Sequence, residues 1–332
     1  MKDHVFNLGN QLKTELELST DFNFPFYNEL LVVGMGGSGV AGDVLKNLIV
    51  ENSNKKVEVR KTYELPEIHN PSNLFLLFIS YSGNTEETIS AVEEAIKLNL
   101  NWGAIASGGK LLDLAKEHNK SFVVVPSGLQ PRAAFGFMTK AVVHFISSDI
   151  QIDAISLCNE AGDYLNEITK EKENSDIAIL SKNLANSINK KTAIIYAATS
   201  VTFLVAQRWK TQINENAKSK AFTGYMPEVH HNEILSWEAD TEGSKNSFII
   251  IFLKDLKDHL QTKKRYDLTK TILGNEVEIV EIENISSKNP IKEIFYLTLL
   301  GDLVSVYQAE LLGIDPYNIK KIEKLKQMLK GN

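Results

Sequence analysis

The sequence has little cysteine, few arginines and no apolar run of membrane-spanning length. The single cysteine, Cys158, excludes a disulfide within the chain and a metal cluster built from cysteines. Four arginines and a net charge of −6 argue against a nucleic-acid-binding protein. The first residues lack the basic-then-apolar pattern of a signal peptide. We therefore expect a cytoplasmic protein that binds neither nucleic acid nor membrane.

What is present is an alternation of apolar strands and amphipathic helices. A helical leader over about residues 3–20 comes first. Strands that are apolar throughout, each followed by a helical pattern, predict a parallel sheet covered by helices on both faces. The fold class is therefore α/β and doubly wound. The strands expected in the first half are 30–34, 56–61, 74–80, 102–107 and 122–126, and a helix is expected over 132–146.

The second half repeats this architecture without obvious repetition of sequence. Residues 149–190 are polar and predict helices, after which the alternation resumes. At 332 residues, two domains are favoured over one, and we place them at 1–150 and 151–332. Further strands are expected at 192–198, 248–253 and 276–282, with helices from about 200, from about 257, and over 289–311 and 316–330.

The first strand leads into a glycine-rich loop, "GMGGSGVAGD". Gly34, Gly36 and Gly39 satisfy the dinucleotide-binding fingerprint. That interpretation predicts an acidic residue at the end of the next strand, where Arg60 and Lys61 stand instead and would suit a phosphorylated dinucleotide. A tight turn that needs glycine for close packing is the other interpretation.

A second loop, "SYSGNTEET", follows the third of these strands and is rich in hydroxyl groups. Both loops are expected at the carboxyl edge of the sheet, where helix N-termini offer free N–H groups to an anion. Such a cradle can hold a phosphate without lysine or arginine. The alternative is that Ser82 or Thr85 only caps the following helix. The candidate phosphate ligands are Gly36, Gly37, Ser38, Ser80, Ser82 and Thr85.

Together the motifs resemble the bifunctional phosphoglucose/phosphomannose isomerase family, which has the sugar isomerase domain fold. The resemblance runs from about residue 28 to 329 and rests on both loops and on "PRAAFGF", "NENAK", "MPEVHHNEI" and "AELLGIDPYNIKKIEKLK". It implies two sugar-isomerase subdomains with the active site between them. It also implies a reversible aldose–ketose isomerisation of glucose 6-phosphate through an enediolate, without a metal or cofactor.

The resemblance assigns four catalytic residues. Glu215 corresponds to the base, and Arg132 to the arginine that stabilises the enediolate. His231, rather than His230, corresponds to the ring-opening histidine, which in the family reaches the active site of the partner subunit. A homodimer is therefore implied.

Lys326 corresponds to the ring-opening partner of the histidine. At about 100° per residue it projects among Ile319, Ile322, Leu325 and Leu329, on the apolar face of the last helix. A lysine in that setting otherwise packs its stem and extends its amine to water.

One position departs from the family, and other functions stay open. Ile319 stands where the family has a threonine that is linked to acceptance of mannose 6-phosphate. The alternatives are an isomerase of another phosphosugar, such as an amino sugar phosphate, and a non-catalytic phosphosugar sensor. A sensor need not retain Glu215, His231, Arg132 and Lys326 together.

Overall fold

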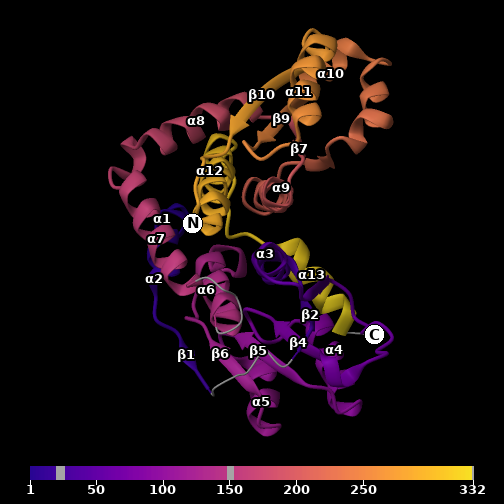
Figure 1. Cartoon of the computed structure of the whole chain (residues 1–332). Helices are drawn as coiled ribbons and strands as arrows, with labels where there is room; N and C mark the ends of the chain where they lie inside the picture. Colours follow the sequence, from indigo (N-terminus) through magenta and orange to yellow (C-terminus); the bar gives the residue numbers. More distant parts are fainter. Residues whose placement is uncertain (20–26, 148–152, 331–332) are drawn as a thin grey trace. The chain divides into compact units, whose positions relative to one another are not determined.

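The computed structural model (Figure 1) describes residues 1–19, 27–147 and 153–330. The chain divides into two compact units. The N-terminal unit contains Phe6–Ile168 and Ser287–Phe295, and the C-terminal unit contains Met1–Val5, Thr169–Ser286 and Tyr296–Asn332. The domain boundary expected near residue 150 lies outside the described residues.

The N-terminal unit has a six-stranded sheet in the order β1-β6-β5-β4-β2-β3. Strands β2 to β6 are parallel to one another, as the sequence predicts, and the short β1 at the edge is antiparallel. The strand bounds are β1 Glu17–Leu18, β2 Glu29–Gly34, β3 Lys56–Arg60, β4 Leu74–Ile79, β5 Trp102–Ala106 and β6 Ser121–Val124.

Helices cover both faces of this sheet, which explains why its central strands are apolar throughout. All six residues of β4 are buried. Leu74, Leu76 and Phe78 join one core cluster with residues of α4 and α5. Alternate residues of a strand point to the opposite face, where α3 and α6 contact each other and the strands. The helices of the unit are α2 Leu8–Lys13, α3 Gly36–Asn52, α4 Glu86–Lys97, α5 Gly109–Glu117, α6 Phe135–Ile146 and α7 Ala154–Ile168.

The C-terminal unit has a four-stranded sheet, all parallel, in the order β10-β9-β7-β8. Its strands are β7 Thr192–Ala197, β8 Ala221–Tyr225, β9 Phe248–Lys254 and β10 Glu278–Glu283. Its main helices are α8 Asp176–Ile188, α9 Ser200–Gln212, α10 Thr241–Ser247, α11 Leu260–Leu273, α12 Pro290–Leu311 and α13 Lys320–Lys330. Helix α12 belongs to this unit from Tyr296 onward. The doubly wound α/β prediction is confirmed.

Several expected elements differ in detail. The leader forms α1 (Lys2–Phe6) and α2, but Glu17–Leu18 is a strand that pairs antiparallel with β6. Strand β8 was not predicted, because it is an edge strand on which Phe222 and Tyr225 are 55% and 45% exposed, so it lacks a continuous apolar run.

Two helices begin later than the sequence predicts. A 3-10 turn, Pro131–Ala133, precedes α6. Helix α13 begins only at Lys320, because the Asp315 carboxylate accepts a hydrogen bond from the Tyr317 N–H (2.9 Å) and the Asn318 side chain accepts one from the Lys320 N–H (3.1 Å). Among the described helices, none combines the length and the apolar character needed to cross a membrane.

Candidate active site

The two loops of the predicted phosphate cradle lie side by side in the N-terminal unit. Strands β2 and β4 are neighbours, and Gly34 pairs with Ile79 at their carboxyl ends. A direct hydrogen bond joins the loops, because the backbone N–H of Tyr81 donates to the Ser38 hydroxyl at 3.1 Å. Helix α3 begins at Gly36 and α4 at Glu86, so both helix N-termini face this edge of the sheet.

The hydroxyl groups of the second loop make hydrogen bonds within the loop rather than cap the helix. Thr85 occupies the N-cap position of α4, yet its side chain makes no capping hydrogen bond. Its Oγ1 lies 2.9 Å from Oγ of the buried Ser80. The Ser82 hydroxyl accepts from the backbone N–H of Asn84 at 3.2 Å. The capping interpretation is therefore wrong for Thr85.

A third loop, which sequence reasoning missed, supports the second. Gly83 has φ +66°, and a Cβ on it would lie 1.8 Å from the Gly108 carbonyl oxygen. Gly109 has φ +74°, and its Cβ would lie 2.6 Å from the Ser82 carbonyl oxygen. The Ser107 hydroxyl donates to the Tyr81 carbonyl oxygen at 2.6 Å. The run "SGGK" directly after β5 was the available signal, because glycine pairs at strand ends favour close backbone approach.

Arg132 lies against the first loop of the same unit. A Cβ on Gly37 would stand 3.4 Å from the Pro131 carbonyl oxygen and 3.7 Å from Arg132 Cα. The arginine is 5% exposed. The buried Gln11 amide holds the turn that carries it, since Gln11 Nε2 donates to the Ala133 carbonyl oxygen (2.8 Å) and Oε1 accepts from the Gly136 N–H (3.0 Å). The structure thus brings Arg132 and the cradle together.

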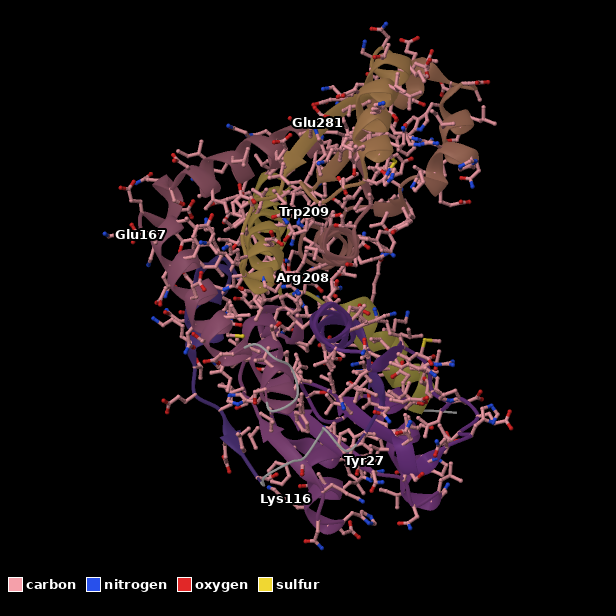
Figure 2. All side chains as sticks on the ribbon, in the orientation of Figure 1. Tyr27, Lys116, Glu167, Arg208, Trp209 and Glu281 are labelled. Atoms are coloured by element: carbon pink, nitrogen blue, oxygen red, sulfur yellow. The ribbon has the colours of Figure 1, made fainter. Side chains whose placement is uncertain are left out.

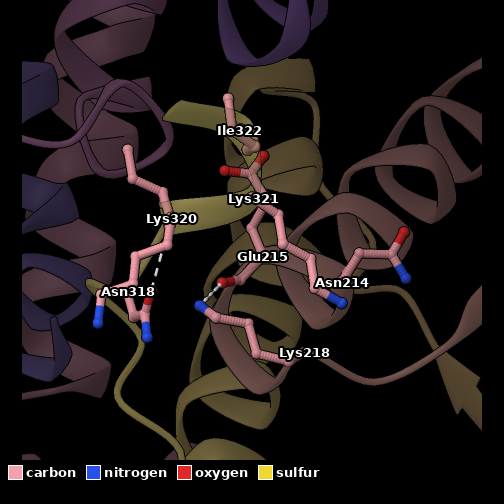
Figure 3. A pocket seen from close by; sticks show the side chains of 8 residues that line it. Asn214, Glu215, Lys218, Asn318, Lys320, Lys321 and Ile322 are labelled. Carbon is pink, nitrogen blue, oxygen red and sulfur yellow. Dashed lines mark hydrogen bonds between the residues drawn. The ribbon is translucent and has the colours of Figure 1, made fainter. Parts of the chain in front are cut away.

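Glu215 lies in the C-terminal unit, in a π-helical turn at the end of α9. The turn spans Ile213–Ala217 and continues α9 without a break. Its half-buried glutamate lines a pocket of about 590 Å³ (Figure 3). The pocket is lined by Asn214, Glu215, Lys218, Asn318, Ile319, Lys320, Lys321 and Ile322.

Lys218 joins the two walls of this pocket. Its ammonium group donates to the Glu215 carbonyl oxygen at 2.5 Å (Figure 3) and to the Pro316 carbonyl oxygen at 3.3 Å. The residue has φ +54°, a left-handed conformation that ends the helical segment. Sequence reasoning did not select Lys218, because a helix-end lysine is ordinarily a surface residue.

The two adjacent histidines have different surroundings. His230 lies 3.2 Å from Arg265 Nη1 through Nδ1 and 2.9 Å from Thr269 Oγ1 through Nε2. Burial and the neighbouring Arg265 charge lower the pKa of the His230 imidazole. His231 is exposed at the end of the 3-10 helix Glu228–His231.

Lys326 lies on α13, about one turn beyond Ile322, the last pocket-lining residue of that helix. It is exposed. The apolar residues expected beside it, Ile322, Leu325 and Leu329, are 41%, 59% and 51% exposed. Ile319, the position that departs from the family, is itself part of the pocket wall.

The six cradle positions and Arg132 therefore belong to the N-terminal unit, while Glu215, His231 and Lys326 lie on three elements of the C-terminal unit. Within residues 1–19, 27–147 and 153–330, no three His, Cys, Asp or Glu side chains form a group that could hold a metal ion.

Solved structures with the same fold include phosphosugar enzymes. The C-terminal domain of glucosamine-fructose-6-phosphate aminotransferase from Francisella tularensis matches with a TM-score of 0.71 and 13% identity, over 95% of this chain and 99% of that one. A hypothetical protein from Thermus thermophilus matches with a TM-score of 0.72 and 12% identity, over 99% of this chain and 89% of that one. At 12% and 13% identity, these matches establish a shared fold.

Sequence relatives identify the family. Residues 178–329 match the model of the bacterial phospho-glucose isomerase C-terminal SIS domain. Bifunctional phosphoglucose/phosphomannose isomerases from Aquifex aeolicus and Caldicellulosiruptor bescii are 37% and 32% identical, over 92% and 99% of this chain and 91% and 98% of theirs. The chain belongs to the bifunctional phosphoglucose/phosphomannose isomerase family, so the prediction from the motifs is confirmed.

A relative of different activity is also found. A D-glucosamine-6-phosphate 4-epimerase from Sulfolobus acidocaldarius is 29% identical over 89% of this chain and 87% of its own length. The relatives of this chain thus carry the names of two different activities, and the two isomerases are more similar to it in sequence than the epimerase is.

Proposed function

We propose that this protein is an aldose–ketose isomerase that interconverts glucose 6-phosphate and fructose 6-phosphate and also accepts mannose 6-phosphate. Family membership supports the reaction. The observation that carries the proposal is the pairing of a glycine-rich loop with a hydroxyl-rich loop through the Tyr81–Ser38 hydrogen bond, with Arg132 packed against the first of them. Two helix N-termini and several neutral donors suit a phosphate dianion.

The proposed mechanism uses side chains from two copies of this chain. His231 and Lys326 open the sugar ring by moving a proton between the ring oxygen and the C1 hydroxyl. Glu215 then removes the C2 proton of the aldose, which leaves an enediolate. A proton passes from the C2 hydroxyl to O1, and Glu215 returns the carbon-bound proton to C1, which gives the ketose with its carbonyl at C2. Arg132 stabilises the oxyanion of the enediolate, as preorganised cationic donors do in other enzymes. Proton transfer between the two carbons needs no metal.

A homodimer is part of the proposal. His231 is exposed on a 3-10 helix, as expected of a residue that serves the active site of a partner subunit. Mixing His231→Ala and Glu215→Gln variants should then restore activity, because each mixed dimer has one site without either substitution. A monomer that is fully active at assay concentration would contradict the shared site.

Coupled assays of the purified protein with three substrates test the reaction. Turnover of glucose 6-phosphate is expected, with turnover of mannose 6-phosphate beside it. The second candidate, an enzyme of amino sugar phosphates, is favoured by the epimerase relative and predicts turnover of glucosamine 6-phosphate instead. A phosphosugar sensor predicts binding of all three sugars without turnover. We also propose a cytoplasmic location, which the single cysteine of the sequence supports.

A further inference from the structure

A buried polar network runs along the contact between α9 and α12 in the C-terminal unit. Arg208 and Asp302 form a bidentate ion pair, Nε to Oδ1 at 3.0 Å and Nη2 to Oδ2 at 2.6 Å. Both side chains are only 2% exposed. Figure 2 shows Arg208 and Trp209 beside α12. One of the four arginines of the chain thus makes a structural contact in the interior rather than lying on the surface.

The two helices approach closely at this network. The Trp209 indole N–H donates to the Leu297 carbonyl oxygen at 2.8 Å. A Cβ on Gly301 would lie 2.1 Å from Trp209 Nε1, so only glycine permits the contact. Because the indole fills the space above Gly301, α9 has no freedom to slide along α12 without breaking both contacts.

The network continues into the π turn that carries Glu215. Asn216, the next residue, is 0% exposed, and its Nδ2 donates to Ser305 Oγ at 2.9 Å. The Ser305 hydroxyl in turn donates to the backbone carbonyl oxygen of Asp302 at 2.7 Å. A hydroxyl has one hydrogen, so Ser305 can only accept from Asn216. The amide therefore has one favourable orientation, which Asp302 and Ser305 define.

The turn that carries Glu215 has π-helical geometry. Its hydrogen bonds run from residue i to i+5, a rare geometry that is found mostly as single turns and often at functional sites. Asn214 holds the outer side of this turn, since its Nδ2 donates to the Ser219 carbonyl oxygen at 2.8 Å. Asn216 holds the buried side. Glu215 is the residue between them, so its direction follows from how both neighbours are held.

We propose that Asn216 is a positioning residue for the reaction: its buried amide, oriented by Ser305 on α12, holds the π turn so that Glu215 presents its carboxylate to the pocket. The inference rests on the proposed role of Glu215 as the base. It assigns no contact between Asn216 and the substrate. The Arg208–Asp302 pair contributes indirectly, because it fixes α12, the helix that carries Ser305, against α9.

The test compares Asn216→Ala, Ser305→Ala and the double variant with wild type. A displacement of about 1 Å in a catalytic group can cost about 10²-fold in rate, so each single variant should lower kcat by about 10- to 100-fold. KM should stay within about twofold, because the phosphate is bound elsewhere. The double variant should have the same kcat as the single variants, since each substitution removes the same Asn216–Ser305 hydrogen bond.

Gln308→Ala is the matched control. Gln308 is also fully buried on α12 and donates through Nε2 to the Asn189 carbonyl oxygen at 2.8 Å, but it contacts a different segment. This variant should lose stability while kcat per folded enzyme stays unchanged. If it lowered kcat as much as Ser305→Ala, or if neither Asn216→Ala nor Ser305→Ala changed kcat, the positioning role would be wrong.

Amide hydrogen exchange of residues 213–218 gives a readout that does not depend on activity. Faster exchange is expected there in Asn216→Ala and Ser305→Ala but not in Gln308→Ala. Unchanged exchange in both variants would overturn the anchoring. Should Asn216→Ala fail to fold, Ser305→Ala, which removes one oxygen atom, still decides. An inactive wild type would contradict the proposed function itself, and the exchange experiment would then still test the anchor.

Discussion

The two units differ in the chemistry of the groups that each contributes to the proposed reaction and in where those groups lie. The candidate ligands of the N-terminal unit are neutral hydroxyl and backbone groups, from Gly36 to Thr85, where two parallel strands end. The proposed C-terminal groups, Glu215, His231 and Lys326, can all gain or lose a proton. A phosphate is already charged and needs only donors, whereas isomerisation moves protons and needs titratable groups. Under the proposed function, the N-terminal unit therefore supplies the phosphate ligands and Arg132, and the C-terminal unit supplies the groups that transfer protons.

The units also stabilise their turns differently. The N-terminal loops use glycine in the left-handed conformation, at Gly36, Gly83 and Gly109. The C-terminal turn uses Lys218, whose side chain then bridges the pocket walls. In both units, however, a buried amide holds the turn of a proposed catalytic residue: Gln11 beside Arg132, and Asn216 beside Glu215. Both units therefore use a buried amide to hold a turn, but the turn carries an arginine in one unit and a glutamate in the other.

The largest expected effect removes the base. Glu215→Gln keeps the shape of the side chain but cannot accept the C2 proton, so kcat should fall by about 10²–10⁴-fold with little change in KM. Exchange of the C2 proton with deuterated water should fall in parallel. Glu228→Gln, at an exposed carboxylate of the same unit, is the control and should behave as wild type. If the C2 proton exchanged as fast in Glu215→Gln as in wild type, another carboxylate would have to be the base.

The next effect concerns stability and is confined to the C-terminal unit. Asp302→Ala leaves the Arg208 guanidinium buried without its carboxylate, which should lower the free energy of unfolding by about 3–5 kcal/mol. Glu278→Ala, at a partly exposed pair with Lys191, should cost less than about 1 kcal/mol. Urea denaturation measures both. Equal losses in the two variants would contradict the importance of burial.

A third prediction concerns the phosphate cradle and tests whether its residues affect substrate binding rather than the rate of the chemical step. In a Ser80→Ala/Ser82→Ala variant, each lost hydrogen bond to the phosphate should cost about 1.5–3 kcal/mol, which appears mainly in KM for fructose 6-phosphate. Ser90→Ala, at an exposed serine on α4, should leave KM unchanged. An unchanged KM in the double variant would place the phosphate elsewhere.

A smaller effect is expected at the pocket wall. Ile319→Thr adds a hydroxyl where the wall is apolar, and one neutral hydrogen bond contributes about 0.5–1.5 kcal/mol. The ratio of kcat/KM for mannose 6-phosphate to that for glucose 6-phosphate should therefore rise by up to about tenfold. Ile319→Val, which adds no hydroxyl, is the control. An equal change in both variants would attribute the effect to volume.

The smallest effect is a pH dependence in the C-terminal unit. Burial alone would raise the pKa of the Glu173 carboxyl, but hydrogen bonds from Lys2, Lys182 and Tyr307 lower it to about 2. The carboxylate therefore stabilises the fold above pH 4.5, its ordinary pKa, and this contribution is lost as the pH falls from 4.5 towards about 2. Because the side chain is 40% exposed, we expect less than about 1 kcal/mol.

Glu173→Gln tests this contribution. Wild type should exceed the variant in free energy of unfolding at pH 6, and the difference should shrink between pH 4.5 and 3. A difference that is constant over this range would show that the charge of Glu173 does not stabilise the fold. Glu171→Gln, at an exposed glutamate nearby, serves as control.

The parallel sheets and the cradle loops could be predicted from the amino-acid sequence alone. Central strands such as β4 are buried on both faces, so their apolar runs are readable without neighbours. The glycine and hydroxyl runs after β2 and β4 lie at strand ends, and adjacent parallel strands bring such ends to one edge. Arg132 lies near these loops because the backbone of Pro131 packs against Gly37, a contact between distant segments that local sequence patterns do not show.

The edge strands, the third loop and the anchoring of Glu215 depend on contacts that form only in the folded chain. Strands β1 and β8 are short or half-exposed, so pairing with a neighbour rather than local pattern makes them strands. The π turn depends on Asn216 meeting Ser305, 89 residues away in the sequence. A contact between distant residues does not change the spacing of apolar residues in either segment. That spacing indicates burial and secondary structure, but not which residue a side chain contacts.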